Sequence, residues 1–449
     1  MYLLGVLFVA LGISVSIALH EYGHLFWAKK FGVKVTQYMV GFGPTIWSRT
    51  RGETEYGLKA IPLGGFTRMI GMFPPKPGAD PSLLRASNTG RFSQLMEQAR
   101  QESMEEVKAG DEERVFYKLS TPKKLVVMLG GPTMNLLIAA VLLGGIFTIY
   151  GYPALTSRVS SVSQCVQTVP ANGKAPAACS PSDPQAPANA AGIRPGDRII
   201  SMAGKPVNNW DDVKALTRPN GGRRIPIVVQ RNGKRLTLAA TPILNNVPRA
   251  DSQGNLVLGA NGKAIIDRVG FLGLSPSYEN VKAPITGVPS LIGSQVAATA
   301  GVVLTLPQRM SGIVKAAFGT GPRDPNLMSV VGVGRVAGEV ADGQLSSGVS
   351  GSGSGSSKFV VLISLIASLN LALFVFNLIP LTPLDGGHAA GALWEGIKRQ
   401  VARLLGRPNP GYVDVAKALP VTNVVATALI GMSVLLMYAD VVNPIKFGG

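Results

Sequence analysis

Charged side chains are scarce in this 449-residue sequence, at 15% of residues, whereas apolar residues make up 46%. That composition excludes an ordinary soluble protein, yet it is too polar for a bare bundle of membrane spans. Acidic residues are fewer than basic ones, 25 against 43, which gives a formal net charge of +18. The sequence has no nucleic-acid motif, so we interpret this charge as basic flanks of membrane spans. We expect a membrane protein with a sizeable water-facing portion and no nucleic-acid partner.

Cysteine is also rare. Cys165 and Cys179 are the two cysteines, neither belongs to a CxxC pair, and both lie in one polar loop. If that loop is outside the cytoplasm, a disulfide between them is expected; otherwise they are two unpaired thiols. The N-terminus has no basic lead-in and no small-residue cleavage site, so we expect no removable signal peptide.

Four stretches are apolar enough to form membrane-spanning helices, which need about 20 residues. Basic residues follow the first and third stretches and precede the second, and none precedes the first. Because such flanks mark the cytoplasmic side, both termini and the long segment between the second and third spans are predicted to lie outside. The stretch 291–318 could add a fifth span. It contains Pro307, Arg309 and Lys315, and we interpret it as a helix lying on the membrane surface.

The sequence HEYGH, residues 20–24, lies inside the first apolar stretch, where ionisable groups are costly and mark functional sites. On a helix, His20 and His24 share one face and can bind one Zn²⁺. Glu21 follows directly, where a carboxylate can take a proton from an activated water and pass it to the leaving amine. A pair of core histidines satisfied by hydrogen bonds is the weaker alternative, since it leaves Glu21 unpaired in hydrocarbon.

A catalytic zinc site usually has a third protein ligand. We expect Asp385, in NLIPLTPLDGGH at residues 377–388, because it follows the inner end of the third span at the depth of the two histidines. The surrounding prolines and glycines break the helix, as backbone that lines a water-filled cavity can. The alternatives are an ordinary helix-ending turn, or His388 as a competing ligand. Asn377 is either a donor to the developing oxyanion or a buried helix-to-helix hydrogen bond.

Further motifs accompany these residues: GFGP at 41–44, IPLGGF at 61–66 and GGPTMN at 130–135. The small residues of GGPTMN allow close helix packing, and Asn135 is placed to hydrogen-bond to the histidine-bearing helix. Together the motifs resemble the site-2 protease family of intramembrane zinc metalloproteases. The segment with AGIRPGDRI is similar to the PDZ domain of its RseP-type branch, and the layout is most like actinobacterial members.

The resemblance implies one Zn²⁺ per chain and cleavage of single-pass membrane proteins, such as anti-sigma factors, within the bilayer of the cell inner or plasma membrane. The active site is expected near the cytoplasmic side. The residue roles implied are metal ligation by His20, His24 and Asp385, catalysis by Glu21, and substrate binding by Asn377, Gly64, Gly65 and Phe66. Two rival hypotheses are a zinc or ion transporter and a catalytically inactive membrane binding module; neither calls for an intact HExxH motif.

The predicted fold is a polytopic α-helical membrane protein with four transmembrane helices, a membrane-proximal β-hairpin region and an extracytoplasmic PDZ-like α/β domain. The β-rich core of that domain includes a hairpin turn at Asn232-Gly233. The predicted segments, in order, are transmembrane helix 1–28, β-hairpin region 34–73, cytoplasmic insert 74–123, transmembrane helix 124–150, PDZ-like domain 156–245, extracytoplasmic connector 246–357 with an amphipathic helix and a Gly/Ser linker, transmembrane helix 358–388, cytoplasmic segment 389–418 and transmembrane helix 419–441.

Overall fold

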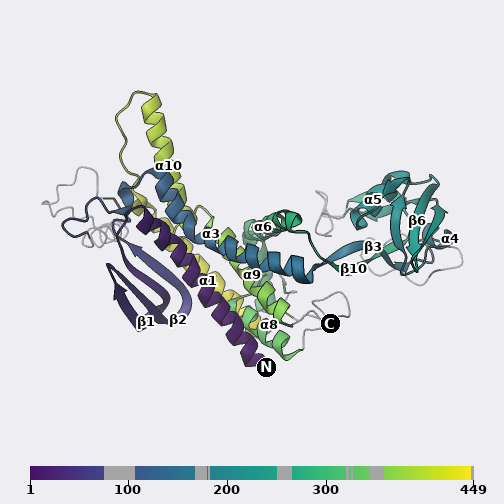
Figure 1. Cartoon of the computed structure of the whole chain (residues 1–449), viewed down its shortest axis with the longest axis horizontal. Coiled ribbons are helices and arrows are strands. Elements are labelled where there is room, and N and C mark those ends of the chain that lie inside the picture. Colours follow the sequence, from purple (N-terminus) through teal and green to yellow (C-terminus); the bar gives the residue numbers. More distant parts are fainter. Residues whose placement is uncertain are drawn as a thin grey trace. The chain divides into compact units, whose positions relative to one another are not determined.

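The computed structural model divides the chain into two compact units (Figure 1). Unit 1 contains residues 1–150 and 282–449, and unit 2 contains residues 151–281. The structure describes residues 1–74, 107–166, 179, 183–249, 265–319, 323–324, 327–343 and 358–445. Residues 75–106 of the predicted cytoplasmic insert and the Gly/Ser stretch 346–357 lie outside these ranges.

Unit 1 is a helical bundle in which α1 packs against α3, α8 and α9. The mostly apolar sequences of α1, α3, α9 and α11 favour helices, because in lipid every backbone polar group must be satisfied internally. The helices are α1 (Tyr2–Lys30), α3 (Thr121–Gly145, extended by the π-helical turn Ile146–Tyr150), α6 (Val288–Leu304), α7 (Leu306–Ala317), α8 (Val330–Asp342), α9 (Lys358–Asn377), α10 (Asp385–Leu404) and α11 (Leu419–Val442).

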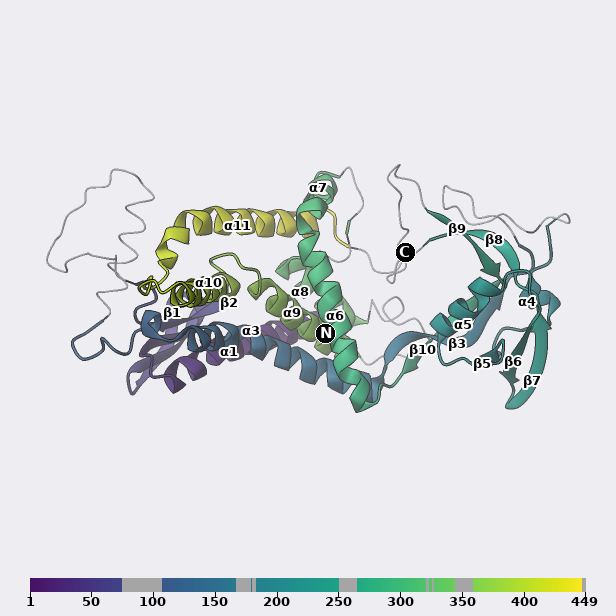
Figure 2. The same cartoon turned by 90° about the horizontal axis from the view of Figure 1, so that it is seen from above.

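Within the described residues, five helices are long and apolar enough to cross a membrane. Four correspond to the predicted spans, and the fifth, Ile285–Leu304, contains α6. Figure 2 shows α6 running across the direction that α1, α3 and α11 share, and none of its residues is buried. A helix on the membrane surface has this orientation, so surface placement and the count of four spans remain our predictions.

The predicted surface helix 291–318 is two helices in the structure. α6 ends at Leu304 and α7 begins at Leu306, with Pro307 in its first turn. Proline has no N–H and clashes with a preceding helical turn, so the helix restarts there instead of continuing. The predicted connector also contains α8, which the sequence did not indicate.

Strands β1 (Val35–Arg51) and β2 (Thr54–Met69) form an antiparallel hairpin beside α1, within the predicted hairpin region. β1 bends after residue 40, where Gly41 and Gly43 have positive φ. Its first half, residues 37–40, pairs with residues 65–68 of β2 on one side and with residues 55–58 of β2 on the other. Within residues 65–68, the Thr67 side chain contacts α1. The edge of the sheet therefore passes directly beside the HEYGH motif.

Unit 2 is a β-rich domain whose main sheet has the strand order β10-β3-β4-β6-β7. Asn232 and Gly233 both have positive φ and join β6 to β7, which confirms the predicted hairpin. The edge strand β10 pairs with β3, so the compact unit ends at residue 281 instead of 245. The elements are β3 (Tyr152–Val162), α4 (Pro187–Ala190), β4 (Arg198–Met202), β5 (Lys205–Pro206), α5 (Trp210–Thr217), β6 (Ile225–Arg231), β7 (Lys234–Ala240), β8 (Ile243–Pro248), β9 (Ile266–Phe271) and β10 (Leu274–Val281).

A buried carboxylate ties the sheet of unit 2 together. Asp197 is fully buried; it accepts two hydrogen bonds of 2.7 Å from the Arg231 guanidinium and one of 2.9 Å from the Arg194 N–H. Burial by itself raises the pKa of Asp197, but these donors outweigh it and lower the pKa below its usual value. Ionised Asp197 therefore stabilises the fold above about pH 4, and this stabilisation is lost as the pH falls through the lowered pKa.

We predict that Asp197→Asn destabilises unit 2 by about 2 kcal/mol near pH 7, because a neutral amide replaces a carboxylate that accepts two hydrogen bonds from the Arg231 guanidinium. Hydrogen–deuterium exchange of the full-length protein, corrected for intrinsic rates, should show lost protection in β4 and β6. Wild type should approach the variant as the pH drops below about 4. Asp211→Asn is the control, since Asp211 is exposed and pairs with Lys214 at the surface. Unchanged protection in Asp197→Asn at pH 7 would contradict this role.

Candidate metal centre

Both histidines of the HEYGH motif lie on the face of α1 that meets α3. The two helices approach closely because three glycines leave no side chain between them: a Cβ at Gly130 would lie 2.5 Å from the Gly23 carbonyl oxygen. A Cβ at Gly131 would lie 2.7 Å from the His20 Nε2. The imidazoles therefore rest directly on the backbone of α3, as the small residues of GGPTMN predicted.

Asp385, the first residue of α10, completes a group of three ligand atoms with these histidines. Its Oδ2 lies 3.2 Å from His20 Nε2 and 3.4 Å from His24 Nε2, and the two nitrogens are 3.3 Å apart. Ligands bound at about 2.0–2.1 Å in tetrahedral geometry lie about 3.3–3.4 Å from one another. Two imidazoles and a carboxylate are also the donor types of a catalytic zinc site, so the residues fit the metal.

The other ring nitrogen of each histidine is held by α3. His24 Nδ1–H donates to the Val127 carbonyl at 2.8 Å, which leaves Nε2 with a lone pair for a metal. His20 Nδ1 lies 3.0 Å from the Asn135 side-chain amide. In the described structure the Asn135 Oδ1 is buried without a hydrogen-bond partner. If the amide is turned so that Oδ1 accepts from His20 Nδ1–H, this oxygen is satisfied and His20 Nε2 also faces the metal position.

Glu21 accepts a hydrogen bond from a residue that lies far from it in the sequence. The Thr67 hydroxyl, on the edge of β2, donates to Glu21 Oε2 at 2.8 Å. A Cβ at Gly65 would lie 2.9 Å from the Glu21 Cγ, so the strand passes close to the carboxylate. Thr67 was not predicted, because only the tertiary packing of β2 on α1 brings it to this site.

The predicted substrate-binding residues lie in two places. Gly64, Gly65 and Phe66 are on β2, with Gly65 and Phe66 paired to residues of β1. Asn377 is half-buried at the end of α9, and it is Asn370 that makes the helix-to-helix hydrogen bond considered for Asn377, donating to Ser16 Oγ at 2.8 Å.

The remaining predicted residues are not among the three ligand atoms that lie within 4.8 Å of one another. His388 lies one helical turn after Asp385 in α10 and lines a small cavity together with Lys124 and Glu395. Cys165 and Cys179 form a disulfide in unit 2, with Cα atoms 5.9 Å apart.

We predict that Gly131→Ala abolishes zinc binding, because its Cβ would occupy the space where the two imidazoles lie against α3. Alanine is a better helix former than glycine, so α3 itself is not weakened. Zinc per chain, measured by mass spectrometry of the purified protein, should fall from one to near zero. Gly145→Ala in the same helix has open space around it and should keep full zinc content. Stoichiometric zinc in Gly131→Ala would refute the prediction.

The model of peptidase family M50 matches residues 8–406 of this chain. The zinc metalloprotease Rip1 of Mycobacterium tuberculosis is 34% identical over 455 residues, which cover 99% of each chain. Rip1 of Mycolicibacterium smegmatis is 32% identical over 462 residues, again covering 99% of each. Because the match extends over most of its length, the protein belongs to peptidase family M50, the site-2 protease family, and is a zinc metalloprotease of the membrane.

Proposed function

We propose that this site-2 protease hydrolyses peptide bonds within transmembrane segments of single-pass membrane proteins, anti-sigma factors among them. The observation that carries the proposal is the convergence of His20, His24 and Asp385, from segments more than 300 residues apart, beside helices apolar enough to span a membrane. A zinc or ion transporter would need the ligands but not Glu21 held by Thr67 next to them.

Glu21 is proposed as the general base and acid. The hydrogen bond from Thr67 occupies Oε2, so Oε1 remains available to take a proton from water and deliver it to the leaving amine. When bound by the two histidines and Asp385, zinc supplies a Lewis acid that lowers the pKa of water and polarises the scissile carbonyl. Asn377, half-buried at the end of α9, is proposed to help position the substrate.

The substrate is proposed to bind as an extended strand along residues 64–69. A helix hides its carbonyls in hydrogen bonds, so a transmembrane substrate must be unwound before cleavage, and pairing with a sheet edge can hold the unwound chain. The proposal is supported by the position of β2, because Gly65 and Thr67 at its edge both lie next to the Glu21 side chain.

We infer that both termini and unit 2 lie outside the cytoplasm and that the metal centre lies near the cytoplasmic side. The inference follows from the basic flanks of the predicted spans. The disulfide between Cys165 and Cys179 supports it, since disulfides persist in oxidising compartments.

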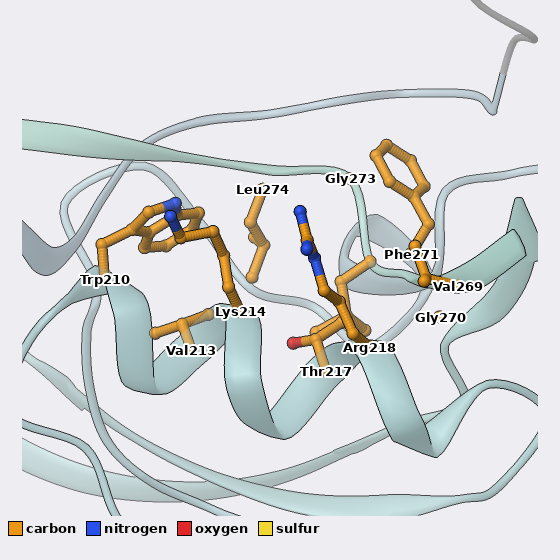
Figure 3. Close-up of a pocket in the computed structure, with 11 residues that line it drawn as sticks. Trp210, Val213, Lys214, Thr217, Arg218, Val269, Gly270, Phe271, Gly273 and Leu274 are labelled. Atoms are coloured by element: carbon orange, nitrogen blue, oxygen red, sulfur yellow. The ribbon is translucent and has the colours of Figure 1, made fainter. Parts of the chain in front are cut away.

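Unit 2 contains an apolar groove with cationic side chains at its mouth (Figure 3). Trp210 and Val213 of α5 line one wall and residues 269–274 line the other, around a cavity of about 180 Å³. Lys214 and Arg218 rise from the same helical segment, and both are exposed. An apolar floor next to positive charge suits a ligand with an apolar side chain beside a carboxylate.

We infer that this groove binds the end of an extended peptide. The alternative role for a PDZ-like domain is to exclude bulky substrates, and the groove favours peptide binding. Strand β10 begins at Leu274 in the groove wall and is the edge strand of its sheet. An extended chain can add to such an edge while its terminal side chain enters the apolar cavity.

We predict that Glu21→Gln keeps one zinc per chain and lowers cleavage of a single-span substrate at least about 100-fold, since general acid–base groups contribute that much. Asp385→Ala should lose both zinc and cleavage, because only two ligands remain. His388→Gln is the control and should keep its zinc. Zinc content and gel-based cleavage in detergent measure both effects; an active Glu21→Gln or a zinc-loaded Asp385→Ala would overturn the assignment.

A second prediction concerns the groove. Lys214→Glu with Arg218→Glu should weaken binding of a fluorescent peptide with an apolar C-terminus about tenfold, or about 1.4 kcal/mol, in anisotropy titrations of the full-length protein. Amidating the peptide should have a similar effect on wild type. Lys205→Glu with Lys234→Glu, both exposed and outside the groove, is the charge-matched control. Equal affinity for free and amidated peptides would show that the groove does not recognise a carboxylate.

A further inference from the structure

A buried ion pair joins α3 to α10, outside the group of metal-ligand atoms. Lys124 Nζ lies 2.8 Å from Glu395 Oε1 and 2.9 Å from Oε2, and their side chains are 5% and 4% exposed. Glu395 also pairs with Arg399 at 3.0 Å and accepts a hydrogen bond from the Val413 N–H at 3.1 Å. Every oxygen of this carboxylate is therefore used, and Lys124 is held between it and the ring of Tyr412.

The two helices joined by this pair carry different parts of the metal centre. α3 supplies Val127, Gly131 and Asn135, the surface on which the two imidazoles are held. α10 supplies Asp385 at its first residue, about 15 Å along the helix axis from Glu395. The distance between Asp385 and the histidines therefore depends on how α10 is placed against α3.

The segment before Asp385 packs closely against the first turn of α10. Residues 378–384 between α9 and α10 are not helical, and they contain Pro380 and Pro383. Packing around this turn is close, since a Cβ at Gly386 would lie 2.6 Å from the Leu378 carbonyl carbon. The turn therefore ties Asp385 to α10, and the buried Lys124–Glu395 pair ties α10 to α3.

We infer that Lys124 and Glu395 form a positioning pair, which sets the depth at which Asp385 meets His20 and His24. A buried ion pair is weak evidence for stability, because desolvation offsets much of its attraction, and its best-attested use is to specify register. The inference rests on the proposed role of Asp385 as a metal ligand.

The chain offers a matched control. Arg323 and Asp440 form a second buried ion pair, with side chains 5% and 3% exposed, and Asp440 likewise accepts a backbone hydrogen bond, from the Ser329 N–H. This pair links the C-terminal end of α11 to the residues before α8 and includes none of the helices that carry the metal ligands. Its loss should disturb packing as much as loss of the Lys124–Glu395 pair.

The experiment replaces each pair by apolar residues, as Lys124→Met/Glu395→Leu and Arg323→Met/Asp440→Leu, in the full-length protein in detergent. Zinc affinity is measured by chelator competition, ligand geometry by the visible absorption of the Co²⁺ form, and stability by the melting temperature of the metal-free protein. We expect the first variant to bind zinc at least tenfold more weakly with an altered Co²⁺ spectrum. The second should match wild type in both, whatever its melting temperature.

Zinc affinity within twofold of wild type in the Lys124/Glu395 variant, or an equal loss in the control, would overturn the inference. If the double variant does not fold, Glu395→Gln and Lys124→Arg replace it; the first should weaken zinc binding and the second should retain it. Asp385→Ala is measured alongside. If that variant keeps wild-type zinc affinity, it is the ligand assignment that fails and not the positioning pair.

Discussion

The imidazoles of α1 rest on the bare backbone of α3 at Gly131, and the metal centre depends on this contact. Glycine in a helix interior is about 1 kcal/mol less favourable than alanine, and α3 places Gly130, Gly131 and Pro132 in succession. Local helix propensity is therefore poor where the two helices meet. Close packing of small residues is a main source of helix association in lipid, so the same glycines that weaken α3 allow it to dock on α1.

Several polar groups in this bundle are paired across helices. Asn370 donates to Ser16, His24 donates to Val127, and the Asn135 amide faces His20. In the same bundle, two imidazole nitrogens and the Asp385 Oδ2 face each other at 3.2–3.4 Å. Three atoms that present lone pairs to one point repel one another unless a cation lies between them, so this convergence suits one metal ion.

Local signals in the sequence were enough to select the proposed metal ligands. The four-residue spacing of His20 and His24 places them on one helix face, and the position of Asp385 at the inner end of the third span predicted that it lies at their depth; the structure brings the three together. Thr67 and the Lys124–Glu395 pair escaped prediction, because they act across contacts between distant segments and have no periodic pattern. α8 was missed for a related reason. Its glycines lower helix propensity, but a Cβ at Gly338 would lie 2.5 Å from the Tyr2 Cδ2, so packing against α1 and not local propensity decides that this segment is helical.

These contacts divide the metal centre into two parts that are held in place by different helices. The histidine pair belongs to the α1–α3 interface, where backbone contacts and one hydrogen bond to α3 fix each ring. Asp385 arrives from a third helix after a proline-containing turn, so its place is set by how α10 packs and not by the histidines themselves. The edge of β2 adds Thr67 to the same point from outside the bundle. A shift of α10 by a fraction of a helical turn would leave the histidines and Glu21 in place while moving Asp385, the proposed third ligand, away. We therefore expect metal affinity and the geometry at Glu21 to be controlled at separate contacts.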